Sequence, residues 1–188
     1  MSGKENSRER LIKTASRLFQ LQGYHATGLN QITKESGAPK GSLYYHFPDG
    51  KEQLAIESVQ LTTAFVSKQI EEGLNKSTDP IEAIQLFIKD MAERFERESC
   101  TVGIPIAAVA LETSLISEPL RASCQSAYQK FQSAFTEKLI QSGYEEKHAM
   151  ELGIVINSMI EGAFLISFTM GKSEPLLLVA KQIPSLLK

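Results

Sequence analysis

The chain has 188 residues, of which 42% are hydrophobic and 22% are charged, and its formal net charge is −2. This length allows a sizeable core, and the composition excludes a largely disordered chain. Because glycine and proline fall between long apolar-periodic runs, the pattern predicts an all-α protein.

Charge is unevenly distributed along the chain. Residues 1–51 hold eight Lys and Arg against four Asp and Glu, a local charge of +4, so the remainder carries about −6. A basic head on an acidic body is a weak indication of a polyanionic partner for the head.

The cysteines and the longest apolar run indicate where in the cell the protein is expected. Cys100 and Cys124 are isolated thiols without metal-ligand spacing, and the chain lacks a charged-then-apolar secretory leader, so we expect a cytoplasmic protein. The apolar run over residues 152–170 includes Glu161. Burial of this charge at a bilayer centre would cost about 2.5–3.5 kcal/mol, so we expect a helix buried by protein and no membrane partner.

The first predicted helix runs from about Ser7, as its N-cap, to Gln22, and Gly23 ends it. A second, short helix starts at Thr27 as its cap and stops at Gly37. Pro39 suits the first position of a third helix. Two short helices joined by a tight turn that contains glycine predict a helix-turn-helix.

The third helix has two distinct faces. At 100° per residue, Leu43 and Phe47 lie on one side with Tyr44 at the edge and Lys40 in the first turn. The opposite side carries Gly41, Ser42, Tyr45 and His46. This face allows close approach and offers hydroxyls and an imidazole near the positive end of a helix, so it predicts contact with a partner molecule.

Proline and glycine breaks divide the rest of the chain into helices. A long helix follows Pro48–Gly50 over about 51–75. Further helices are predicted at about 80–97, 105–115, 118–142, 145–170 and 174–187. Asp79 and Pro80 are the expected cap and first residue of the 80–97 helix, and Glu174-Pro175 marks the break before the last helix.

At residues 8–54, the sequence RERLIKTASRLFQLQGYHATGLNQITKESGAPKGSLYYHFPDGKEQL closely resembles the DNA-binding domain of the tetracycline-repressor (TetR) family. The matching positions are Ala15, Leu18, Phe19, Gly23, Tyr24, Thr27, Ile32, Gly37, Leu43, Tyr44, His46, Phe47, Lys51 and Leu54. The long spacing before Lys51 looks like the YxaF/LmrA-type branch. Gly28 and Thr33 depart from the usual threonine and alanine.

The resemblance implies a homeodomain-like three-helix helix-turn-helix DNA-binding domain over residues 1–53, followed by a helical ligand-binding and dimerisation domain over residues 54–188. It implies a repressor that binds a palindromic double-stranded DNA operator as a homodimer and is released by a small apolar or aromatic inducer. Activation in place of repression stays open.

The resemblance also implies which residues carry these functions. The third helix enters the major groove, with phosphate contacts from Thr27, Tyr45, His46 and Lys51, groove-facing roles for Lys40, Gly41 and Ser42, and Tyr44 shared between core and DNA. The expected ligand-lining residues are Phe87, Met91, Phe95, Ile104, Ala107, Ala108, Leu111, Phe131, Phe164 and Phe168. Such a stripe at helical spacing is more often ordinary core.

The last two helices are the expected dimer interface, where Gly153, Gly162 and Ala163 would let a partner helix approach closely. We expect no enzyme activity, cofactor or metal, because no nucleophile–base or metal-ligand arrangement can be read.

Two other classes of function remain open. A helical enzyme or small-molecule carrier predicts no salt-dependent DNA binding. A helical adaptor that uses the head to dock a protein would not bind DNA. Changes at Tyr45 and His46 would then leave DNA affinity untouched, because there is none.

Overall fold

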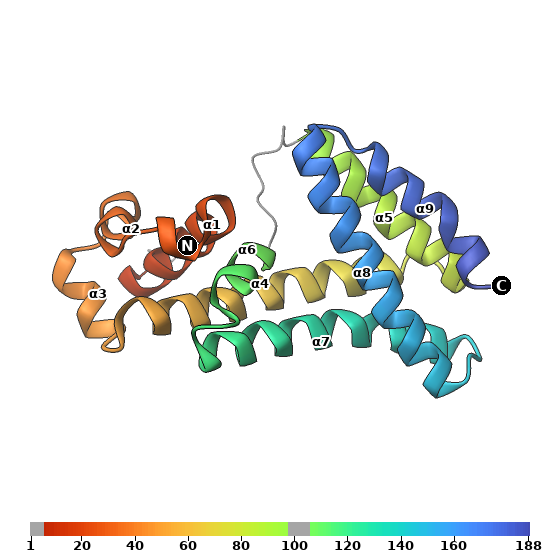
Figure 1. Ribbon diagram of the computed structural model, residues 1–188, viewed down its shortest axis with the longest axis horizontal. Coiled ribbons are helices and arrows are strands. Elements are labelled where there is room, and N and C mark those ends of the chain that lie inside the picture. The colour runs from red at the N-terminus through yellow and green to blue at the C-terminus, as the bar shows by residue number, and fades with distance from the viewer. Residues whose placement is uncertain (1–5, 98–105) are drawn as a thin grey trace, which may run out of the picture. The chain divides into compact units, whose positions relative to one another are not determined.

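The computed structural model describes residues 6–97 and 106–188, and every regular element within them is an α-helix (Figure 1). In chain order the helices are α1 (Ser7–Ala26), α2 (Leu29–Ser36), α3 (Lys40–His46), α4 (Gly50–Leu74), α5 (Pro80–Arg97), α6 (Ala107–Thr113), α7 (Glu118–Gln141), α8 (Glu146–Met170) and α9 (Glu174–Leu186). The predicted all-α class is confirmed. The predicted proline and glycine breaks separate these helices.

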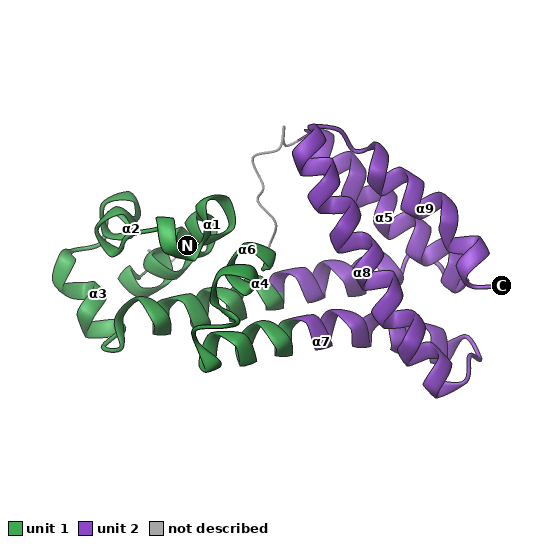
Figure 2. Cartoon of the chain, in the orientation of Figure 1, with its two compact units in different colours: residues 1–64, 103–127 green, residues 65–102, 128–188 purple. Residues whose placement is uncertain are grey.

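The chain forms two compact units, which Figure 2 colours separately. A head unit comprises residues 1–64 and 103–127, and a body unit comprises residues 65–102 and 128–188. α4 and α7 each begin in the head unit and continue into the body unit. This division differs from the contiguous domains expected on either side of residue 53, because α6 packs on α1 and so joins the head.

α1 organises the head unit. Its buried residues include an apolar stripe at helical spacing, Leu11, Ile12, Ala15, Leu18 and Phe19. The helix cap lies one residue earlier than expected, because the Asn6 side chain accepts the backbone N–H of Glu9 at 2.9 Å. At Gly23 the backbone is left-handed, with φ of 82°, so the helix breaks there before a last turn that ends at Ala26.

A tight turn joins α2 to α3, as predicted. Gly37 adopts φ of 62° at the end of α2, and Arg10 donates to the carbonyl oxygens of Ser36 and Gly37, each at 3.3 Å. Pro39 has an extended backbone, with ψ of 139°, so it caps α3 and is not the first helical residue. Gly28, and not Thr27, occupies the N-cap of α2, and no side chain bonds there.

The body unit contains α5, α8 and α9, with α9 packed against both α5 and α8 (Figure 1). Gln85 on α5 donates to the Ala180 carbonyl oxygen of α9 at 2.8 Å. The predicted cap of α5 is confirmed, since Asp79 accepts the backbone N–H of Glu82 at 2.7 Å. A Cβ at Gly153 would overlap Thr136, so α8 and α7 pack too closely for a larger residue.

α8 is long and apolar enough to cross a membrane by length and composition. However, one of its faces is buried within the protein and includes the amide side chain of Asn157. A core helix meets the same criteria, so these properties are weak evidence for a membrane span.

Candidate nucleic-acid interface

α3 presents the predicted surface. Lys40 and Gly41 are exposed, Tyr44 and Tyr45 are exposed by 56% and 81%, and Ser42 and His46 are half-buried. On the opposite side, Leu43 and Phe47 are buried and anchor the helix to the head. The sequence of α3, KGSLYYH, contains no acidic residue. The structure therefore brings six of the eight predicted DNA-binding residues together on one helix.

Aromatic contacts hold the end of α3. The His46 ring lies edge-on to Tyr45, with ring centres 4.9 Å apart, and the Arg8 guanidinium lies 5.6 Å from the centre of the Phe47 ring. Arg8 also forms an ion pair with Glu57 of α4. These contacts limit the rotamers of the exposed groups, so the surface is partly preorganised.

Thr27 does not lie on this surface. Its side chain is fully buried, and its hydroxyl donates to the Gly23 carbonyl oxygen at 2.7 Å. A buried hydroxyl with that partner cannot reach a phosphate, so the predicted contact is wrong. The sequence was misleading because threonine before a helix is a common cap, whereas here Gly28 takes that position and Thr27 bridges the break in α1.

Lys51 lies in the first turn of α4 and is half-buried. Its ammonium group lies 4.4 Å from the centre of the Tyr24 ring and donates to the His25 carbonyl oxygen at 3.5 Å. Burial lowers the pKa of Lys51, and the Glu112 carboxylate acts in the opposite direction. The side chain is thus held against the end of α1.

Glu112, on α6, is a residue that sequence reasoning missed. Its carboxylate accepts the backbone N–H of His25 at 2.6 Å. The partners are 87 positions apart in the sequence, so no local pattern could have indicated this contact. A Cβ at Gly23 would overlap the same carboxylate, so a side chain at this position would displace Glu112 in addition to straining the positive φ.

The predicted ligand-lining residues are divided between the two units. Phe87, Met91, Phe95, Phe131, Phe164 and Phe168 belong to the body unit, Ala107, Ala108 and Leu111 belong to the head unit, and Ile104 lies outside the described residues. The rings of Phe95 and Phe164 meet edge to face with centres 5.9 Å apart. Leu111 is 81% exposed, so the structure does not place it in an enclosed lining.

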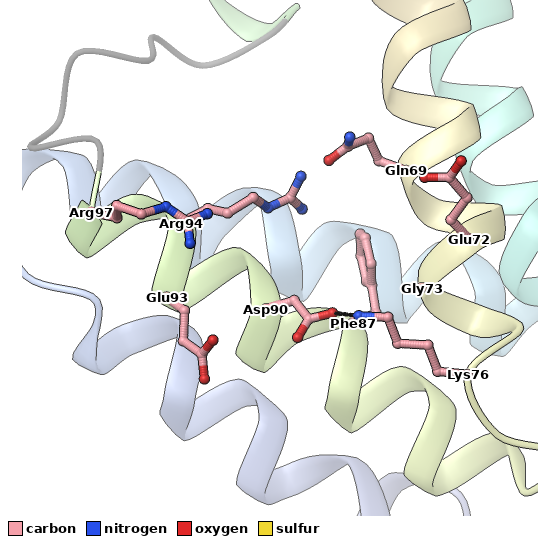
Figure 3. A pocket seen from close by; sticks show the side chains of 9 residues that line it. All are labelled: Gln69, Glu72, Gly73, Lys76, Phe87, Asp90, Glu93, Arg94 and Arg97. Carbon is pink, nitrogen blue, oxygen red and sulfur yellow. Dashed lines mark hydrogen bonds and ion pairs between the residues drawn. The ribbon is translucent and has the colours of Figure 1, made fainter.

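A cavity of about 290 Å³ opens between α4 and α5 of the body unit (Figure 3). Its lining residues are Gln69, Glu72, Gly73, Lys76, Phe87, Asp90, Glu93, Arg94 and Arg97. Lys76 and Asp90 form an ion pair, and Arg94 extends from α5 toward Gln69 on α4 (Figure 3). Only Phe87 belongs to the predicted lining, so this cavity is polar and not mainly aromatic as expected.

Two further titratable groups, one buried and one half-buried, have raised pKa values. Burial raises the pKa of the Cys124 thiol to about 11, so this thiol is not a reactive thiolate at neutral pH. Burial also raises the pKa of Glu161 to about 7. Over residues 6–97 and 106–188, no group of three His, Cys, Asp or Glu side chains could hold a metal ion.

Comparison with known proteins identifies the family. Residues 11–57 match the family described as "Bacterial regulatory proteins, tetR family", and residues 80–182 match "Transcriptional regulator LmrA/YxaF-like, C-terminal domain". The chain is 53% identical over 188 residues to the HTH-type transcriptional regulator YxaF of Bacillus subtilis (strain 168), covering 100% of this chain and 98% of that one. The protein belongs to the TetR family. It is a transcriptional regulator and not an enzyme.

Two other proteins support this assignment to the TetR family. The regulator LmrA of the same organism is 51% identical over 183 residues, and the alignment covers 97% of this chain and 97% of LmrA. A crystal structure of a TetR transcriptional regulator from Legionella pneumophila superposes with a TM-score of 0.86 at 22% identity, covering 100% of each chain. At this identity the superposition supports the fold alone, and it agrees with a helix-turn-helix head followed by a helical C-terminal domain.

Proposed function

We propose that this TetR-family protein is a cytoplasmic repressor that binds a palindromic operator as a homodimer and leaves it when a small ligand binds. The observation that carries the DNA-binding part is the exposed face of α3, which is free of acidic residues and is fixed to the head by Leu43 and Phe47. A recognition helix needs this combination of an open face and a rigid support.

Different residues of the interface have different roles. Lys40, at the exposed start of α3, can bond the O6 and N7 atoms of guanine, a contact worth about 1–3 kcal/mol of discrimination between bases. Gly41 lets the helix backbone approach the groove, and Ser42 and Tyr44 lie beside it. In this proposal Tyr45, His46 and Lys51 bond phosphates, which contribute affinity but little specificity.

The occupant that we propose for the outer face of α8 is a second copy of this chain. Ile154, Val155, Leu165 and Ile166 are each exposed by 41–52% and lie on one side of the helix. Gly162 lies among them with nothing within 4 Å of its Cβ position. Gly153 and Ala163 are instead buried within their own protomer, so close approach of a partner helix depends on Gly162.

Leu177 and Leu178 of α9, which packs against α8, are also exposed, by 45% and 53%, and we assign them to the same interface. A two-fold pair would bury it, and an operator with two half-sites requires such a pair. Apolar packing between copies also explains why α8 is apolar on more than one face.

We propose that the ligand binds in the body unit. α4 and α7 continue from this unit into the head, so a ligand that prefers one arrangement of these helices changes the affinity of the head for DNA. The cavity between α4 and α5 is polar, and the arginines among its lining residues, Arg94 and Arg97, lead us to propose a ligand that carries an acidic group. Stabilisation by salicylate but not by benzyl alcohol, lost in Arg94→Gln, would support this ligand class.

DNA binding to the fragment upstream of the protein's own gene, titrated with salt, tests the proposed function. Lys51→Ala should weaken all sequences about equally and lower the magnitude of the salt slope by about 0.9. Lys40→Ala should alter base preference, and Lys130→Ala, an exposed change on α7, should do neither. Absence of salt-dependent binding in the parent protein would favour a carrier or adaptor.

A further inference from the structure

We propose that Glu112 is a positioning residue of the DNA interface, because its carboxylate attracts Lys51, to which a DNA phosphate would also bind, and thereby limits operator affinity. The inference rests on the proposed DNA binding of the head. It concerns a residue of α6, outside the helix-turn-helix.

Glu112 and Lys51 both bind the same residue, His25. The backbone N–H of His25 donates to the Glu112 carboxylate at 2.6 Å, and the Lys51 ammonium group donates to the His25 carbonyl oxygen at 3.5 Å. The two opposite charges therefore lie near each other and attract each other electrostatically. A DNA phosphate would attract the same ammonium group.

The site is shaped for this carboxylate. Gly23 has φ of 82°, which turns the chain so that Tyr24 and His25 leave the axis of α1. A side chain at Gly23 would overlap Glu112, so the absence of a Cβ allows the contact. The backbone break in α1, the glycine and the acid on α6 thus belong to one arrangement.

Lys51 is the group for which Glu112 and DNA compete. Without DNA, its ammonium group lies against the Tyr24 ring and the His25 carbonyl oxygen. A lysine that bonds a phosphate must leave part of this environment, and its attraction to Glu112 opposes the move. Since Glu112 is carried by α6, the position of α6 determines how strongly Lys51 is retained.

The test measures operator affinity in the full chain with Glu112→Gln, which keeps an acceptor for the His25 N–H but removes the charge. We expect affinity to rise about two- to fivefold, the range for a partly exposed ion pair. Glu118→Gln is the matched control, because it makes the same charge change in the head unit at an exposed position paired with Arg121.

A double-mutant cycle separates this role from general charge effects. In a Lys51→Ala background, Glu112→Gln should leave affinity unchanged. Glu112→Asp keeps the charge on a shorter side chain. The operator affinity of this variant should therefore lie between that of the parent and that of Glu112→Gln. This second variant keeps the proposal testable if Glu112→Gln does not fold. Equal or weaker binding by Glu112→Gln, or the same gain in the Lys51→Ala background, would overturn the proposal.

A measurement without DNA distinguishes failure of this inference from failure of the proposed function. NMR titration of the Lys51 ammonium group should show a lower pKa in Glu112→Gln than in the parent, because the neighbouring negative charge is gone. An unchanged Lys51 pKa would refute the interaction between the two residues. Absence of DNA binding in the parent together with a shifted pKa would refute the proposed function alone.

Discussion

Glu161 is a half-buried carboxyl group on α8 whose protonation should affect stability. Its pKa is raised to about 7 by burial, above the value of 4.5 expected when the chain is unfolded. The folded state therefore retains the proton longer than the unfolded state. The stabilising contribution is complete below about pH 4.5 and is lost as the pH rises through 7.

We expect the free energy of unfolding to decrease between pH 5 and pH 8 by at most about 3 kcal/mol because of this group. Glu161→Gln should remove that part of the pH dependence, since the amide does not titrate. Urea unfolding at both pH values measures it, with the exposed Glu137→Gln as the control. A parent protein as pH-dependent as Glu161→Gln would show that the carboxyl group is well solvated.

Single residues also show where sequence patterns are insufficient. The exposed face of α3 follows from helical periodicity alone, and the structure confirms its orientation. Thr27 was misassigned because its hydroxyl bonds a carbonyl oxygen made available only by the break at Gly23. Neither Glu112 nor Arg94 belongs to a sequence motif. Glu112 contacts the end of α1, which is distant in the sequence, and Arg94 faces α4 across the cavity.

At the scale of elements, the close packing of α7 and α8 depends on Gly153. A Cβ there would overlap the Thr136 hydroxyl and lie 2.9 Å from the Gln132 carbonyl oxygen, an atom of the α7 backbone that cannot easily move. We expect Gly153→Ala to lower the free energy of unfolding by about 1–3 kcal/mol, as overpacking does. Thermal and urea unfolding would measure the loss.

Gly41→Ala is the matched control for Gly153→Ala. It makes the same substitution in an exposed part of α3, where nothing lies within 4 Å of the Cβ position. This variant should be stabilised by up to about 1 kcal/mol, because alanine favours a helix over glycine. Its operator affinity should nevertheless fall, since the added methyl group opposes close approach to the groove. Similar losses of stability in both variants would rule out the packing explanation for Gly153.

Helix boundaries were the most predictable elements of the fold. Asp79 with Pro80 and Glu174 with Pro175 predicted the starts of α5 and α9, because a cap and an early proline act locally. The cap of α1 moved from Ser7 to Asn6 because both residue types serve equally well. How helices group into units depends on contacts distant in the sequence, so the place of α6 in the head could not be predicted.

At the scale of the whole molecule, the proposed homodimer can be tested at the outer face of α8. Ile154→Glu combined with Ile166→Glu places two charges on the proposed interface, where pairing would bury them without partners. We expect a monomer by size-exclusion chromatography with light scattering. Operator affinity should fall at least about 100-fold, because the two heads no longer bind as one ligand.

The control for assembly is Leu115→Glu, which places an acid on a residue that is 98% exposed in the head unit. This variant should remain as oligomeric as the parent. A double variant of α8 that keeps the size of the parent would locate the interface elsewhere on the surface.

The discontinuous head unit has a consequence for engineering regulators from this family. A chimera that grafts only residues 1–53 onto a foreign body would place an unrelated α6 against Gly23 and His25. Either a bulky residue would press on the exposed amide, or the amide would face no acceptor at all. To exchange operator recognition between relatives, residues 107–113 should therefore be transferred together with the N-terminal segment.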